Sequence, residues 1–159
     1  MKKLTGSFRY TQWDPWLIIS QIVTIQCVLY LTLGLWLALL GTLVGDTRTL
    51  DHIFEYHELQ VRDFGGRMVI FAFILNALVG AAVLLFVVER TKLCMDFTST
   101  WHLIHLVICW FYNKKFPSSI SWWLLNTACA TIMCVCAEFL CLRSELKAIP
   151  LSLGPKTDL

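Results

Sequence analysis

Four long stretches without a charged side chain alternate with short charged segments along this chain. They contain 31, 21, 17 and 22 residues, at positions 15–45, 68–88, 97–113 and 116–137. A helix needs roughly 20 mainly apolar residues to cross the hydrocarbon core of a bilayer, which is about 30 Å thick. Three stretches are therefore long enough to cross a membrane as helices, and the third lies at the lower limit.

The third stretch allows two interpretations. It spans the membrane if its helix also takes in Leu93 to Asp96, and otherwise it is a re-entrant segment that enters and leaves on one side. We favour the spanning form. The pattern then predicts an all-α polytopic membrane protein, with four transmembrane helices in one bundle and a single domain over 1–159. The predicted spans are 16–44, 68–88, 94–112 and 118–142.

The segment between the first two spans, Gly45 to Arg67, is mainly acidic but periodic. Apolar residues recur at helical spacing from Leu50 to Val61, which predicts a short amphipathic helix that ends at Gly65 and Gly66. Within the first charge-free stretch, small residues follow one another at close to helical spacing. Such a ridge lets two helices approach closely, and its members are Gly34, Ala38, Gly41 and Gly45.

Composition supports the membrane interpretation. The chain has 159 residues, of which 57% are hydrophobic and only 15% charged, against about 25% charged in a soluble domain. So small a core cannot enclose four apolar helices away from water, so we expect the bilayer to cover them. The net charge of +2 is too small to indicate a nucleic-acid partner.

Seven cysteines form no disulfide framework, because six lie in or beside apolar stretches and their number is odd. Cys94 and Cys141 lie near the predicted membrane edge beside basic residues, so both are candidates for palmitoylation. Lys and Arg number eight on the face with both termini and five on the other. The positive-inside rule therefore places both termini in the cytosol.

Polar side chains within the apolar stretches are the main candidates for a site, because such groups are costly in a membrane and are functional by default. Seven form a predicted intramembrane polar network: Gln21, Asn76, Thr98, His102, His105, Asn126 and Glu138. We favour interhelical hydrogen bonding as their role. His102, His105 and Cys109 share a helix face and are a second possibility as metal ligands.

The third possibility is a transport path in a small oligomeric transporter or channel that uses His102, His105 and Glu138. The chain has no HExxH, GxSxG, phosphate-binding loop or Gly-rich nucleotide motif. We therefore expect neither enzymatic activity nor a cofactor.

Nearly the whole chain resembles the Sys family of Golgi integral membrane proteins, weakest in the acidic loop and the first dozen residues. No single motif is diagnostic, but the order and spacing of many are. They are Trp13–Pro15, Ser20–Val23, Leu33–Ala38, Phe73–Leu78, Asp96–Thr98, His102, His105–Leu106, Cys109–Tyr112, Phe116–Ser118, Trp122–Leu124, Glu138, Leu140–Cys141, Arg143, Glu145–Lys147 and Ile149–Leu151.

The resemblance implies a four-span receptor in the membrane of the trans-Golgi network. It implies that the receptor docks an Arf-related small GTPase with an acetylated amino terminus, which in turn recruits an Arf-like GTPase and a golgin for traffic from endosomes. With cytosolic termini, the last tail is the largest accessible segment. We expect Arg143, Glu145 and Lys147 to help docking, and Thr157–Leu159 fits a PDZ ligand.

Overall fold

The computed structural model describes residues 14–44, 51–54 and 64–148, and all of its regular structure is α-helical. Its helices are α1 (Pro15–Val44), α2 (Asp51–Phe54), α3 (Phe64–Val87), α4 (Thr91–Asn113) and α5 (Ile120–Ala148). The predicted all-α class is therefore confirmed. The PDZ-type motif, the ridge residue Gly45 and most of the acidic loop lie outside the described residues.

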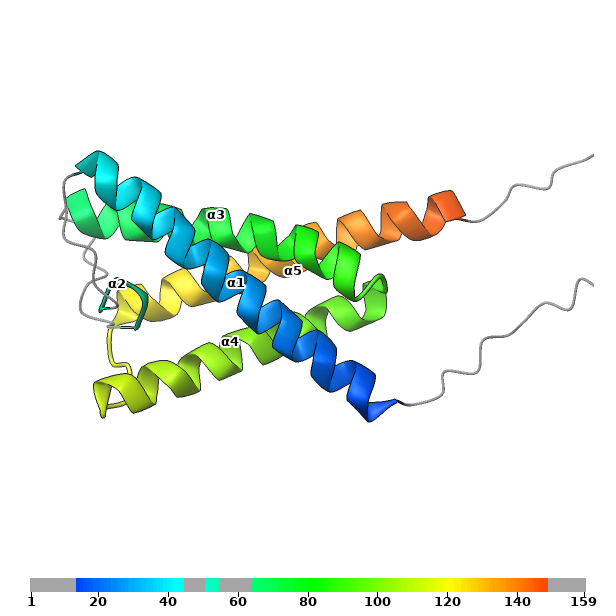
Figure 1. Ribbon diagram of the computed structural model, residues 1–159, viewed down its shortest axis with the longest axis horizontal. Coiled ribbons are helices and arrows are strands. Elements are labelled where there is room, and N and C mark those ends of the chain that lie inside the picture. Colours follow the sequence, from blue (N-terminus) through cyan, green and yellow to red (C-terminus); the bar gives the residue numbers. More distant parts are fainter. Residues whose placement is uncertain (1–13, 45–50, 55–63, 149–159) are drawn as a thin grey trace, which may run out of the picture.

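The four long helices run between two ends of the bundle (Figure 1). α3 packs against both α1 and α5, and α5 packs against α4, whereas α1 crosses α4 over a short stretch. The start of α1, the end of α5 and the α3–α4 connection lie at one end, which we call the termini end. The α4–α5 connection and α2 lie at the opposite end, which we call the loop end.

The outside of the bundle is apolar. Side chains such as Leu31, Phe86 and Phe111 are 72%, 76% and 79% exposed. Contiguous apolar surface of this kind marks contact with a membrane or a partner. Helices α1, α3 and α5 are each long and apolar enough to cross a bilayer, so the chain is a polytopic membrane protein.

α4 is less apolar because two histidines and Asp96 lie within it, but it is a continuous helix of 23 residues. At 1.5 Å per residue it is about 34 Å long. It contacts α5 at two levels, through Cys94 and Cys141 at the termini end and through the rings of His105 and Trp122 past its middle. We infer that α4 crosses the membrane beside α5, because it follows α5 through the bundle.

α4 begins at Thr91, so residues 93–96 are helical, as the spanning interpretation requires. Arg90 is extended at the N-cap position and gives no side-chain cap. The carboxylate of Glu145 on α5 instead accepts a hydrogen bond from the Thr91 backbone N–H, at 3.1 Å. A carboxylate there satisfies an otherwise unpaired donor and complements the helix dipole.

Two expectations about glycine differ from the structure. Gly65 and Gly66 lie in the first turn of α3, so the chain is helical where the loop helix was expected to end, and residues 55–63 of that helix lie outside the described residues. In α1, a Cβ added at Gly34 or Gly41 would meet nothing within 4 Å. Gly34 and Gly41 therefore make no close helix contact among the described residues.

Of the three glycines Gly34, Gly41 and Gly80, only Gly80 is tightly packed, at a point where α1, α3 and α5 meet. A Cβ there would lie 2.8 Å from Sδ of Met133 and 3.3 Å from Cδ2 of Leu29. α3 supplies small buried residues on both sides of this point, Ala77 and Ala81. Small residues let helices pack closely in a membrane, where dispersion contacts replace the hydrophobic effect.

We expect Gly80→Val to lower the thermal unfolding temperature of the purified protein, because overpacking a tight contact costs about 1–3 kcal/mol. Gly34→Val is the matched control, since the same side chain there meets open space. Adding Met133→Ala to Gly80→Val should recover part of the loss by removing the obstructing atoms. Equal effects at Gly80 and Gly34 would contradict this packing.

Candidate functional site

His105 of α4 lies at the centre of the bundle and is only 1% exposed. Its ring is stacked between those of Trp101 and Trp122, with centroids 6.0 and 6.3 Å away and interplanar angles of 15° and 11°. Further aromatic rings approach it from α1, α2 and α3; these are Tyr30, Phe54 and Phe73. Each of the five described helices therefore contributes an aromatic ring to the cluster around His105.

Both ring nitrogens of His105 have partners. The Tyr30 hydroxyl lies 3.1 Å from Nδ1, and Sγ of Cys109 lies 3.5 Å from Nε2. A buried polar group that is fully hydrogen-bonded avoids the penalty of desolvation. Since aromatic rings enclose it and its nitrogens are both in use, His105 has the environment of a structural residue.

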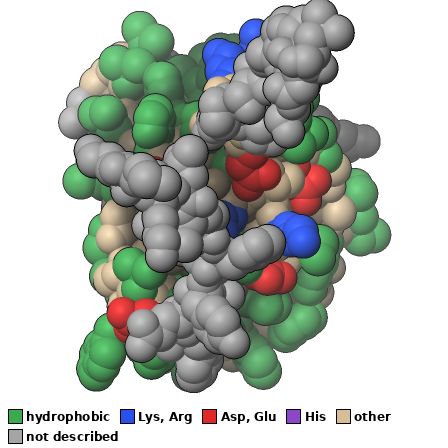
Figure 2. Space-filling model, turned by 90° about the vertical axis from the view of Figure 1, so that its right-hand side faces the viewer, with side chains coloured by type: hydrophobic (Ala, Val, Ile, Leu, Met, Phe, Trp, Pro, Cys, Tyr) green, Lys and Arg blue, Asp and Glu red, His purple; other side chains and the backbone are tan. Residues whose placement is uncertain are grey.

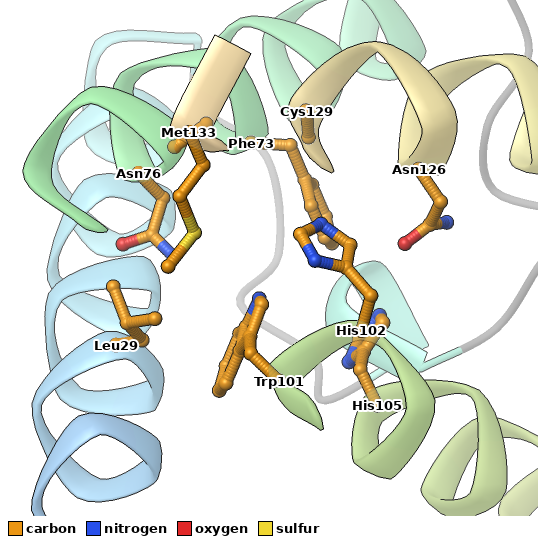
Figure 3. Close-up of a pocket in the computed structure, with 10 residues that line it drawn as sticks. Leu29, Phe73, Asn76, Trp101, His102, His105, Asn126, Cys129 and Met133 are labelled. Atoms are coloured by element: carbon orange, nitrogen blue, oxygen red, sulfur yellow. The ribbon is translucent and has the colours of Figure 1, made fainter. Parts of the chain in front are cut away.

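His102, one turn earlier, lines a small cavity between α1, α3, α4 and α5 (Figure 3). Its Nδ1–H donates to the Thr98 carbonyl oxygen at 2.9 Å, because a carbonyl oxygen can only accept a hydrogen bond. Asn76 and Asn126 also line the cavity, which measures about 20 Å³. That volume holds about one water molecule.

Three of the seven predicted network residues bond to another helix. The Thr32 hydroxyl donates to Oδ1 of Asn76 at 2.6 Å. Gln21 donates to the Val87 carbonyl oxygen at the end of α3, at 2.8 Å. With the contact between Tyr30 and His105, these bonds join α1 to α3 and α4.

The remaining predicted residues bond within their own helices. Asn126 donates to the Trp122 carbonyl oxygen at 3.0 Å, and Thr98 accepts from His102 through its carbonyl. The Thr98 hydroxyl is buried and has no partner among the described residues. Glu138 accepts a hydrogen bond from the Cys134 thiol at 3.5 Å and does not line the cavity.

The structure therefore brings His102 and His105 together at the cavity and leaves Glu138 elsewhere on α5. The described residues contain no group of three histidine, cysteine or acidic side chains that could hold a metal ion. His105 directs its nitrogens at Tyr30 and Cys109, and His102 commits one nitrogen to its own helix.

Sequence reasoning missed the residues that complete this cluster, above all Tyr30 and Thr32 of α1. A tyrosine in the middle of an apolar span is a detectable signal, because its hydroxyl needs a partner there. Asn113 was also missed as a network member. Its Nδ2 donates to the Phe54 carbonyl oxygen at 2.7 Å and so fastens α2 to the end of α4.

Charged side chains gather at the termini end, with hydrophobic side chains around them (Figure 2). Arg143, Glu145 and Lys147 lie in the last turns of α5 and are exposed. Glu145 is engaged at the start of α4, whereas Arg143 and Lys147 have no partner among the described residues. The three predicted docking residues therefore differ in role.

The two candidate palmitoylation sites face each other. The Sγ atoms of Cys94 and Cys141 are 3.5 Å apart, and both residues are fully buried. An acyltransferase cannot reach a thiol enclosed between α4 and α5 in this fold. The position of these cysteines near the membrane edge was therefore a misleading signal.

Fold and site together define a polytopic helical membrane protein whose polar groups join its own helices. The profile described as "Integral membrane protein S linking to the trans Golgi network" matches residues 8–151. The chain belongs to this family, the SYS1 family of trans-Golgi integral membrane proteins. The resemblance found in the sequence is thereby confirmed.

Three relatives show how far the similarity extends. The SYS1 homolog of Nematostella vectensis is 46% identical over 151 residues, which cover 95% of this chain and 96% of the relative. The Dictyostelium discoideum homolog is 38% identical over 95% of this chain and 65% of its own length. Protein SYS1 of Saccharomyces cerevisiae is 28% identical over 79% of this chain and 62% of its own. No solved structure matches the chain.

We expect His105→Ala to destabilise the protein by about 3 kcal/mol, as for other large-to-small changes in a core. His102→Ala should cost about 1 kcal/mol, since it removes one bond within a helix beside an existing cavity. Tyr30→Phe removes only the hydroxyl and should cost about 0.6 kcal/mol, the average for hydrogen bonds between membrane helices.

Denaturant unfolding of the purified variants would measure this order. The structural assignment of His105 fails if His102→Ala proves the more damaging change. It also fails if His105→Ala leaves stability unchanged.

Proposed function

We propose that this chain is a non-catalytic receptor in the trans-Golgi network that recruits an Arf-related small GTPase with an acetylated amino terminus. Recruitment would support vesicle traffic between endosomes and this compartment. Family membership supports the compartment, and the exposed basic end of α5 is the observation that carries the docking role.

A receptor is physically necessary for such a partner. Even a myristoyl chain binds a membrane only marginally, and an acetyl group buries much less apolar area. The GTPase would then need a protein contact to stay at the membrane. This chain is suited to the task, because its apolar outer surface holds it in the bilayer.

Of the three residues expected to help docking, we propose that Arg143 and Lys147 contact the GTPase. Both are exposed on the final turns of α5. Neither side chain has a partner among the described residues, so both charges can contact another protein. Glu145 lies between them but accepts the Thr91 N–H, so its change would disturb α4 as well. A docking test should therefore leave Glu145 in place.

We expect Arg143→Glu combined with Lys147→Glu to reduce GTPase recruitment at least about tenfold, as the loss of two charge contacts of about 1 kcal/mol each implies. Recruitment can be measured by binding of the GTP-loaded partner to vesicles that contain the full chain. Lys114→Glu with Lys115→Glu is the matched control, because it reverses two charges at the loop end. Undiminished binding to the α5 variant would contradict the proposal.

The proposal also requires the termini end to face the cytosol. We expect epitope tags at both termini to be accessible to antibody after the plasma membrane alone is permeabilised, because Lys and Arg are more numerous on that side. A tag inserted between α1 and α3 should need permeabilised Golgi membranes. Tags at the termini that prove accessible from opposite sides would exclude four spans.

A further inference from the structure

The outward face of α4 changes character along its length. Towards the termini end it exposes Lys92, Asp96 and Ser99 at one-turn intervals. Towards the loop end the same face exposes apolar side chains, which are Leu103, Val107 and Trp110. Met95 lies on this face between Lys92 and Asp96 and is 59% exposed, and Leu93 beside it is 37% exposed. We call Lys92, Asp96 and Ser99 the polar patch of α4.

The contacts between α4 and α5 give the depth of this patch. Thr91 lies level with Glu145, and Cys94 lies level with Cys141. Because the helices are antiparallel and rise equally per residue, Asp96 lies level with Phe139. Phe139 is 61% exposed, and Leu142 beyond it is 48% exposed.

The exposed apolar side chains of α5, Phe139 and Leu142, therefore continue outward past the depth of Asp96 until Arg143, beside the half-buried Glu138. Arg143 of α5 lies level with about Lys92 of α4. The charge of Asp96 therefore lies about one turn, or ~5 Å, deeper in the membrane than that of Arg143. The Asp96 carbonyl accepts from Thr100, but the carboxylate has no partner among the described residues. A short aspartate side chain also cannot extend far to reach water, as lysine does.

The lengths of the charge-free segments agree with this difference. Asp96 and Lys114 are 18 residues apart, and Arg67 and Glu89 on either side of the second span are 22 apart. At 1.5 Å per residue these separations are about 27 and about 33 Å. The first matches the hydrocarbon thickness of thin membranes such as the endoplasmic reticulum, and the second matches the thicker plasma membrane.

We propose that the polar patch of α4 binds lipid headgroups of a locally thinned leaflet at the termini end of the bundle. The headgroups and their water solvate Asp96 where hydrocarbon would otherwise cover it. The protein consequently prefers thin bilayers, and α4 sets this preference. The proposal does not depend on the receptor role.

The test is to reconstitute the full chain in phosphatidylcholine vesicles whose acyl chains lengthen in regular steps. The thermal unfolding temperature is measured in each. Wild type should be most stable in short-chain lipid, and Asp96→Leu should move this optimum by at least one step towards longer chains. Lys92→Leu is the matched control and should keep the wild-type optimum, because Lys92 already lies at headgroup level.

Asp96→Asn removes the charge with little change of shape, so it guards against a folding defect in the leucine variant. It should move the optimum in the same direction. An unmoved optimum in both Asp96 variants would overturn the proposal. So would equal stability of the wild type in all lipids, the result expected if a protein partner and not lipid covers the patch.

Discussion

A polar group in the hydrocarbon core of a bilayer must find its hydrogen-bond partner inside the protein, because no water is available there. This constraint organises the bundle. It directs the Tyr30 hydroxyl of α1 to His105 of α4, and the Thr32 hydroxyl two residues later to Asn76 of α3. α1 contacts α4 over only a short stretch, so the bond from Tyr30 defines where the two helices cross. The aromatic rings then pack around that crossing.

Small residues solve the complementary problem of packing without a hydrophobic driving force between helices. Gly80 lets Met133 and Leu29 approach α3 from two sides, and its position allows three helices to meet at one level. A Cβ added at Gly34 or Gly41 meets nothing within 4 Å among the residues that the structure describes. The pattern shows that close approach is sterically allowed, whereas the contact itself depends on the direction each helix face takes in the fold.

How much of the structure can be predicted from the sequence depends on this difference between what a pattern allows and which contacts the fold makes. Charge-free length gave the helices, since the bilayer sets a one-dimensional requirement that a sequence displays directly. The polar residues within these stretches, His102, His105 and Asn76, could also be identified as costly groups that need partners. The sequence could not identify those partners, because Tyr30 is separated from His105 by 75 residues. It likewise could not show that Glu145 caps α4 or that Cys94 faces Cys141, because these contacts join the start of α4 to the end of α5.

α4 illustrates how one helix can meet two demands. Its inward face carries His105 and Cys109 into the aromatic centre of the bundle, where every described helix supplies a ring. Its outward face carries Asp96 at a depth where α5 exposes Phe139. The polar side chains of α4 are therefore divided between an internal network and the lipid boundary. A helix with only the first role would not need a charge on its outer face, so the position of Asp96 is more simply explained by the membrane around the protein than by the packing within it.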